Sequence, residues 1–95
     1  MNEVPLFSSL NIKSITLRNR IVLSPMCQYK DKDGMISDWH LQHYSRFAFS
    51  GLGAAFVEAT GVTPGGRIGH GCTGIWSDDH IEGLSKIAKT FKEYN

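Results

Sequence analysis

Five side chains suited to contacting a ligand stand directly after a short apolar run, in the stretch "IVLSPMCQY": Ser24, Pro25, Met26, Cys27 and Tyr29. The thioether of Met26 is polarisable and can cover a flat aromatic ligand. The thiol of Cys27 can act as a weak donor or as a redox-active group, and the Tyr29 hydroxyl can hydrogen-bond a substrate oxygen. The alternative interpretation is a buried strand end in which Met26 and Cys27 only pack.

A second apolar run, "AAFVEAT", ends at Ala59 and Thr60. Parallel α/β proteins bind ligands beyond the carboxyl ends of their strands. Both strand ends therefore lie on one predicted rim, where the small Ala59 allows a ring system to lie against the backbone.

The elements that position this rim alternate along the chain. We expect a hairpin at about 12–20, strands at about 21–25 and 54–60, and helices at about 38–51 and 77–94. Ser37 or Asp38 is a typical N-cap for the first helix, and Gly51 or Gly53 a typical end. A hairpin followed by two strand–helix units predicts an α/β fold with parallel strands.

Apolar residues at helical spacing predict which helix faces pack. The face expected in the first helix consists of Leu41, Tyr44, Phe47 and Ala48. The face expected in the second helix consists of Ile81, Leu84, Ala88 and Phe91. The polar stretch "KDKDGMISD" is typical of a surface loop, with Gly34 supplying the turn.

Composition excludes several function classes. The 95 residues are 41% hydrophobic and 20% charged with a formal net charge of +1, so nucleic-acid binding is not expected. No apolar run approaches the roughly 18 residues of a membrane span. The start "MNEVPLFSSL" does not resemble a signal peptide, so we expect a cytoplasmic protein with two free thiols.

The histidines and cysteines suggest a metal site only weakly. A zinc site built from Cys27, Cys72, His40, His43 and His70 lacks the CxxC or HxxxH spacing of known sites, so no metal is expected. His40 and His43 are more typical of helix packing or local hydrogen bonds. The loop "TPGGRIGHGCTG" matches neither phosphate-binding glycine pattern, and its Arg67 is expected to be solvated.

Three stretches, "LRNRIVLSPMCQY", "VEATGVTPGGRIG" and "GIWSDDHIEG", together resemble the old yellow enzyme family of flavin-dependent ene-reductases. The resemblance is strongest to its thermophilic-like branch, the YqjM-type NADPH dehydrogenases. It covers about residues 6–94 and implies the hairpin and first two βα units of a TIM (β/α)8 barrel, a partial barrel.

The resemblance also implies cofactors, site residues and partners. FMN would be the bound cofactor, NADPH or NADH the reductant, and an activated alkene the small-molecule substrate. The residues matching the family's flavin contacts are Ser24, Pro25, Met26, Cys27 and Ala59. Tyr29 matches a substrate-contacting tyrosine, and Cys27 a cysteine that tunes the flavin potential.

The family's catalytic histidine pair and proton-donating tyrosine match no position in residues 1–95. We therefore expect a part of an oxidoreductase that is inactive alone and does not bind FMN tightly. The alternative is a non-catalytic partial-barrel module that self-associates or assembles with a partner chain through exposed strand edges.

Overall fold

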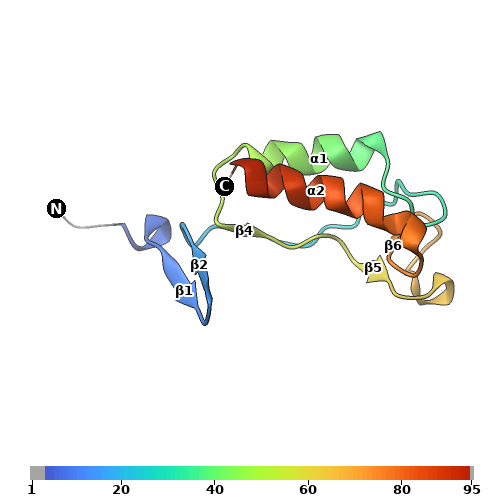
Figure 1. Ribbon diagram of the computed structural model, residues 1–95, viewed down its shortest axis with the longest axis horizontal. Helices are drawn as coiled ribbons and strands as arrows, with labels where there is room; N and C mark the ends of the chain where they lie inside the picture. Colours follow the sequence, from blue (N-terminus) through green and yellow to red (C-terminus); the bar gives the residue numbers. More distant parts are fainter. Residues whose placement is uncertain (1–3, 95) are drawn as a thin grey trace.

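The computed structural model describes residues 4–94 (Figure 1). Its strands are β1 (Leu10–Ile12), β2 (Ile15–Leu17), β3 (Val22–Leu23), β4 (Ala54–Ala55), β5 (Thr60–Gly61) and β6 (Thr73–Gly74). Its helices are α1 (Asp38–Ala48) and α2 (Ile81–Tyr94), with short 3-10 turns at Pro5–Phe7, Pro64–Gly66 and Asp78–His80.

The hairpin lies slightly earlier than predicted. Strands β1 and β2 pair antiparallel with Leu10 opposite Leu17, and the turn falls at Lys13, whose φ is 52°. Asn19 marks the next change of direction, as its sequence context suggests, because its side chain accepts from the Ile21 N–H at 3.0 Å. Its amide also donates to the Gly51 carbonyl at 2.7 Å, which joins the hairpin to the end of α1.

The strands that follow pair in parallel, as predicted. Strand β3 pairs with β4, placing Val22 opposite Ala54. The single strand expected at 54–60 is instead two, since residues 56–59 pair with no strand and β5 then pairs with β6. Strand β6 lies within the predicted glycine-rich loop, so that loop is not wholly irregular.

Helix α1 begins after Ser37 and ends at Ala48, three residues before the predicted end. Gly51 then reverses the chain with a φ of +86°. The predicted apolar face is confirmed: Tyr44 and Ala48 are buried, and Leu41 and Phe47 pack against the core.

The apolar face predicted for α2 is partly wrong. Ile87 is its buried residue, flanked by the half-buried Leu84 and Phe91, whereas Ile81 and Ala88 are exposed. The least exposed stripe of α2 is therefore 84–87–91, of which Ile87 and Phe91 belong to the hydrophobic core that includes Tyr44 of α1.

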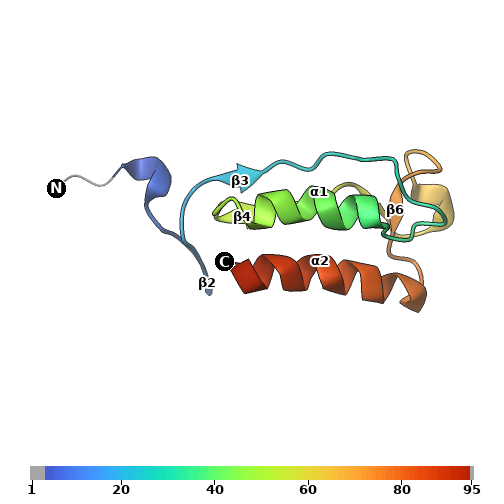
Figure 2. The same cartoon turned by 90° about the horizontal axis from the view of Figure 1, so that it is seen from above.

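Helices α1 and α2 lie side by side and cover one side of the extended strand segments (Figures 1 and 2). The shape is elongated, at 52 × 24 × 20 Å, and the radius of gyration of 15.0 Å exceeds the roughly 12 Å of a compact domain of this length. Within residues 4–94 the strands form no closed barrel. None of the helices in this part of the chain is long and apolar enough to cross a membrane.

Candidate functional site

The two predicted strand ends lie on the same edge of the molecule. Strands β3 and β4 run parallel, and the Phe56 N–H donates to the Leu23 carbonyl at 3.0 Å just beyond them. We call residues 24–29 and 56–60, which continue from this edge, the strand-end rim. Met26 is 43% exposed and Ser24, Pro25 and Ala59 are also exposed, while Cys27 is half-buried.

Tyr29 has an unusual backbone and a perturbed hydroxyl. Its φ of 55° lies in the left-handed region, which is uncommon for a bulky side chain. A hydrogen bond with Cys27 raises the pKa of the exposed Tyr29 above its ordinary value. The glycine-rich loop approaches this residue closely, since a Cβ on Gly71 would stand 2.6 Å from the Tyr29 carbonyl oxygen.

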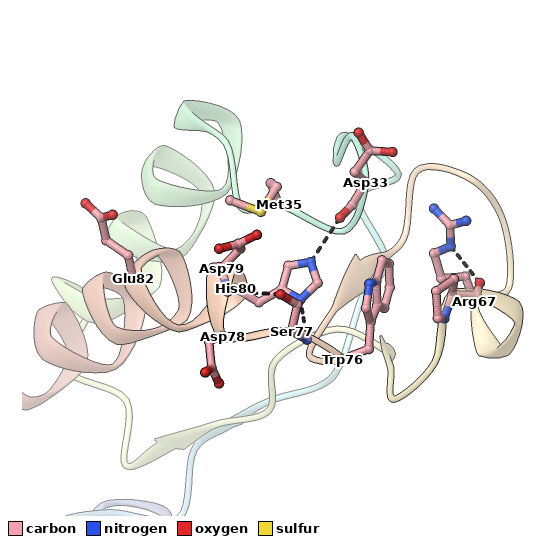
Figure 3. A pocket seen from close by; sticks show the side chains of 10 residues that line it. Asp33, Met35, Arg67, Trp76, Ser77, Asp78, Asp79, His80 and Glu82 are labelled. Atoms are coloured by element: carbon pink, nitrogen blue, oxygen red, sulfur yellow. Dashed lines mark hydrogen bonds between the residues drawn. The ribbon is translucent and has the colours of Figure 1, made fainter.

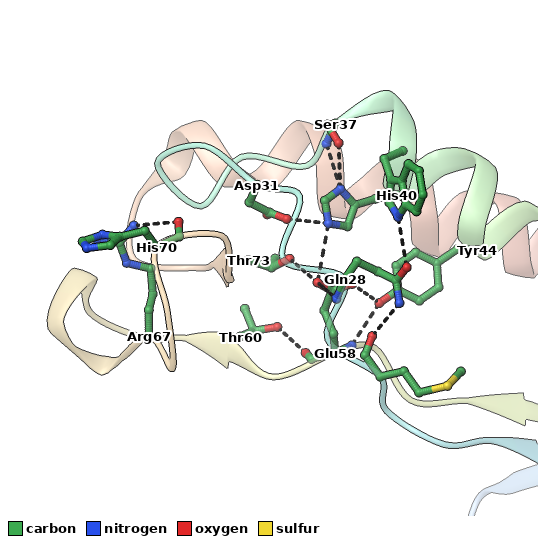
Figure 4. A network of polar contacts seen from close by, with 12 residues as sticks. Gln28, Asp31, Ser37, His40, Tyr44, Glu58, Thr60, Arg67, His70 and Thr73 are labelled. Atoms are coloured by element: carbon green, nitrogen blue, oxygen red, sulfur yellow. Dashed lines mark hydrogen bonds and ion pairs between the residues drawn. The ribbon is translucent and has the colours of Figure 1, made fainter.

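Behind the rim lies a cluster of polar side chains that the sequence analysis did not predict (Figure 4). The buried polar cluster consists of Asp31, His40, Tyr44, Glu58 and Thr73, each at most 9% exposed. Helix α1 supplies two of them at i, i+4 spacing, and the loop after β3, the segment after β4, and β6 supply one each. The sequence signal was a lone glutamate inside the apolar run "AAFVEAT", because a buried carboxylate requires partners.

Glu58 is the best-connected member of the cluster. Its Oε2 accepts from the Tyr44 hydroxyl at 2.7 Å, and the same hydroxyl accepts from the Glu58 N–H at 3.0 Å. Its Oε1 accepts from the Thr73 hydroxyl at 3.2 Å and from the Gln28 N–H at 3.4 Å. Both carboxylate oxygens therefore have hydrogen-bond donors although the side chain is buried.

Asp31 and His40 form the second half of the cluster. The His40 Nε2 contacts Asp31 Oδ1 and lies 3.5 Å from Glu58 Oε1. Burial is the main reason that the pKa of Asp31 is raised, with Thr73 and His40 opposing it. Burial also raises the pKa of Tyr44 strongly. The loop at 30–38 is thus not only a surface loop, because Asp31 reaches into the interior.

The same local motif precedes both helices. "SDWH" at 37–40 and "SDDH" at 77–80 each place a histidine three residues after the N-cap serine. In both, the serine N–H donates to the histidine Nδ1 at 3.2 Å, as in a capping box with histidine in place of glutamate. The Nε2 of His80 lies 2.9 Å from the Asp33 carbonyl, so both histidines hold the loop after β3.

His80 borders an open hollow of about 780 Å³ beside the glycine-rich loop (Figure 3). Arg67 is not free in solvent there, contrary to expectation. Its Nε donates to the Pro64 carbonyl at 2.8 Å, and its guanidinium lies 5.2 Å from the centre of the Trp76 ring. One side of the hollow is therefore formed by Arg67, whose side chain is already bonded to the Pro64 carbonyl and lies over Trp76.

The cysteines and the other histidines do not gather into the zinc site considered from the sequence. Among residues 4–94, one trio offers ligand atoms within 4.8 Å of one another, and it is Asp31, His40 and Glu58. His43 instead packs edge-on against Tyr44 and lies 3.2 Å from an Arg46 nitrogen. Burial, followed by Arg46, lowers the pKa of His43.

Two exposed side chains of the rim are free to contact a ligand. The flexible thioether of Met26 and the small Ala59 are exposed on neighbouring segments, and the Cys27 thiol is half-buried. Two hollows, the one in Figure 3 and one beside Trp39 and His43, are lined by residues outside the rim.

Comparison with known proteins assigns the family. Residues 5–95 match the model of the NADH:flavin oxidoreductase / NADH oxidase family. The chain is 50% identical over 96 residues to an NADPH dehydrogenase of Geobacillus thermodenitrificans, covering 99% of this chain and 28% of that protein. An NADPH dehydrogenase of Bacillus subtilis is 48% identical over 90 residues, covering 93% and 27%.

Solved structures agree on the fold. An old yellow enzyme from Pichia sp. superimposes with a TM-score of 0.85 at 26% identity, over 95% of this chain and 24% of that one. Morphinone reductase in complex with tetrahydroNAD gives a TM-score of 0.85 at 22% identity, over 98% and 25%. The described elements thus correspond to part of a TIM barrel, and the chain spans about a quarter of the length of the curated relatives it matches. On this evidence the chain belongs to the NADH:flavin oxidoreductase / NADH oxidase family.

Proposed function

We propose that this chain supplies one wall of the FMN site of an old yellow enzyme-type reductase, which uses NADPH or NADH to reduce activated C=C bonds. The observation that carries the proposal is the strand-end rim. Its exposed small and sulfur-bearing side chains follow two parallel strands whose fold and sequence match that family.

The residues of the rim have distinct roles in this proposal. Met26 and Ala59 pack against the flavin ring, with Ser24 and Pro25 setting the path of the backbone beside it. Cys27 adjusts the polarity next to the ring. Tyr29 offers its hydroxyl to the substrate, and a phenol is protonated and able to donate at neutral pH.

Bound FMN would supply hydride transfer between the nicotinamide and the β-carbon of an enone, enal or nitroalkene. The histidine pair expected to stabilise negative charge on the substrate oxygen and the proton-donating tyrosine match no position among residues 1–95, which offer only the Tyr29 hydroxyl to the substrate. The remaining walls of the site must therefore come from additional polypeptide. The chain alone is expected to show neither tight FMN binding nor NADPH turnover.

A chimera tests this function. The 95 residues replace the matching segment of the Geobacillus thermodenitrificans NADPH dehydrogenase, to which they are 50% identical. We expect this chimera to bind FMN and to consume NADPH in the presence of an enone. A folded chimera that does neither would refute the proposal.

Two exposed alanines provide a matched pair of variants in the chimera. Ala59→Leu adds bulk on the rim where the flavin ring is proposed to lie, whereas Ala88→Leu adds the same bulk on the exposed side of α2. We expect Ala59→Leu to weaken FMN binding at least about tenfold, which is 1.4 kcal/mol. Ala88→Leu should leave it unchanged. Equal effects of the two variants would show that Ala59 does not contact the flavin.

A further inference from the structure

The hydrogen bonds around His40 fix which of its nitrogens carries the proton. The Ser37 N–H donates to the Nδ1 of His40 at 3.2 Å, and the Ser37 hydroxyl, which lies 2.9 Å from the same Nδ1, can donate to it as well. A ring nitrogen that accepts a hydrogen bond has no hydrogen of its own, and neutral imidazole has one N–H. The hydrogen is therefore on Nε2, the atom that contacts Asp31 and lies 3.5 Å from Glu58.

This Nε2–H stands between the two segments of the strand-end rim. Asp31 lies two residues beyond Tyr29, the last residue of the first segment, and Glu58 directly precedes Ala59 within the second. Glu58 also accepts from the Gln28 N–H, next to Cys27, at 3.4 Å. Because β3 and β4 contain only two residues each, backbone pairing alone holds these segments over a short distance.

We propose that His40 is a positioning residue, whose Nε2–H joins Asp31 to Glu58 and thereby sets the spacing of the two rim segments. The part of this inference that concerns the flavin rests on the proposed function. His40 does not touch the rim face itself, because it is fully buried on α1 (Figure 4). It acts through the two carboxylates, as residues behind a ligand-binding face commonly do.

The hydrogen-bond donors around Asp31, His40 and Glu58 argue against a metal site formed by these three residues. A metal ion would need the lone pair of His40 Nε2, and that requires moving the proton to Nδ1 against the Ser37 N–H. Glu58 already accepts three side-chain or backbone donors from Tyr44, Thr73 and Gln28. The geometry suits a hydrogen-bonded cluster that holds segments together.

His80 provides an internal comparison. Its Nδ1 accepts from the Ser77 N–H at 3.2 Å, and its Nε2 faces the Asp33 carbonyl at 2.9 Å. A carbonyl oxygen only accepts, so Nε2 must donate. The same tautomer in the same motif supports the assignment for His40.

The first test is a long-range ¹H–¹⁵N spectrum of the chain at mildly alkaline pH. We expect a directly visible Nε2-bound proton for His40 and for His80, exchanging slowly with water. The exposed His70 is the control and should show no such proton. An Nδ1-bound proton on His40, or no protected proton, would overturn the proposal without bearing on whether the chimera binds flavin.

The second test uses three substitutions of His40 that differ in where, or whether, the new side chain places an N–H. His40→Gln places an amide N–H near the position of Nε2, whereas His40→Asn places it near Nδ1 and His40→Leu provides none. In the chimera, we expect His40→Gln to keep the FMN dissociation constant within about threefold. His40→Asn and His40→Leu should raise it at least about tenfold.

The rim can also be followed without flavin, through the amide shifts of Gln28 and Ala59 in the chain. We expect His40→Gln to preserve them and His40→Asn to move them. Equal behaviour of the Gln and Asn variants would refute the positioning role. A chimera that binds no FMN would refute the proposed function instead, and the amide shifts would still decide the role of His40.

Discussion

At the scale of single residues, the interaction between Cys27 and Tyr29 links the two most reactive side chains of the rim. The thiol is half-buried and the phenol is exposed, on a backbone that lies in the left-handed region and that Gly71 approaches closely. Their hydrogen bond, more than any other cause, raises the pKa of Tyr29. A substitution of Cys27 is therefore expected to change the pKa of Tyr29.

Replacing Cys27 should lower the pKa of Tyr29 towards its ordinary value of 10.0, because the hydrogen bond and the nearby thiolate charge are both removed. The measurement is a pH titration of the Tyr29 ring carbon by NMR in Cys27→Ala. Cys72→Ala is the matched control and should produce a smaller change, since Cys72 is the weakest of the causes. A larger change from Cys72→Ala would contradict this assignment.

The contribution of Asp31 to the stability of the fold falls as pH rises, whereas the contribution of most acidic residues increases. Its pKa is raised in the folded chain, so the native state holds this proton more tightly than the unfolded state. The resulting stabilisation is present below the ordinary value of 3.8 and is lost as pH rises through the raised pKa.

We expect the stability of Asp31→Asn, relative to the unsubstituted chain, to increase as pH rises above about 4, because asparagine has no charge to bury. Urea unfolding of both chains at several pH values measures this difference. Asp33→Asn, at an exposed position of the same loop, should change stability little at any pH. A relative stability that falls with rising pH would show that Asp31 is stabilised as a carboxylate.

At the scale of elements, short strands are held by contacts outside their own ladders. Strands β3 and β4 contribute two residue pairs, so the turn at Asn19 and the chain entering β4 must fit closely. A Cβ on Gly53 would lie 2.1 Å from the backbone oxygen of Asn19. Glycine is therefore required there for packing between two backbones.

Gly53→Ala should lower the free energy of unfolding by about 1–3 kcal/mol, as overpacking at a tight site usually does. The matched control is Gly65→Ala, because a Cβ at Gly65 has no other atom within 4 Å. Urea unfolding compares the two. If Gly53→Ala were as stable as Gly65→Ala, the close packing of the hairpin on β4 would be wrong.

Local signals predicted the element order well, because capping serines, glycines and apolar spacing act within a few residues. Ser37 does precede α1, and Leu41, Tyr44, Phe47 and Ala48 do face the core. The division of 54–60 into β4 and β5 was not predictable in this way. It depends on β6, a partner more than ten residues away.

The buried polar cluster also escaped prediction for a physical reason. Asp31, His40 and Glu58 come from three separate segments, and only Glu58, inside the apolar run "AAFVEAT", stands out from its neighbours in the sequence. Residue spacing within one helix did reveal that His40 and His43 serve packing and local hydrogen bonds. It did not reveal that His40 reaches two carboxylates.

At the scale of the whole molecule, the two helices cover one side of the strands, while large apolar side chains stand exposed elsewhere. Phe56 is 62% exposed and Val62 is 74% exposed, in or beside the unpaired rim segment. An exposed apolar surface of this kind is typical of an interaction site. Self-association of the chain remains the alternative to completion by further barrel, and size-exclusion chromatography distinguishes a defined oligomer from aggregation.

The most direct test of the account is the amount of FMN bound by the chain alone and by the chimera, measured from visible spectra of the two purified proteins. We expect a colourless chain and a yellow chimera with about one FMN per protein. A folded but colourless chimera, or a chain that binds stoichiometric FMN by itself, would contradict the claim that these residues form one wall of a flavin site.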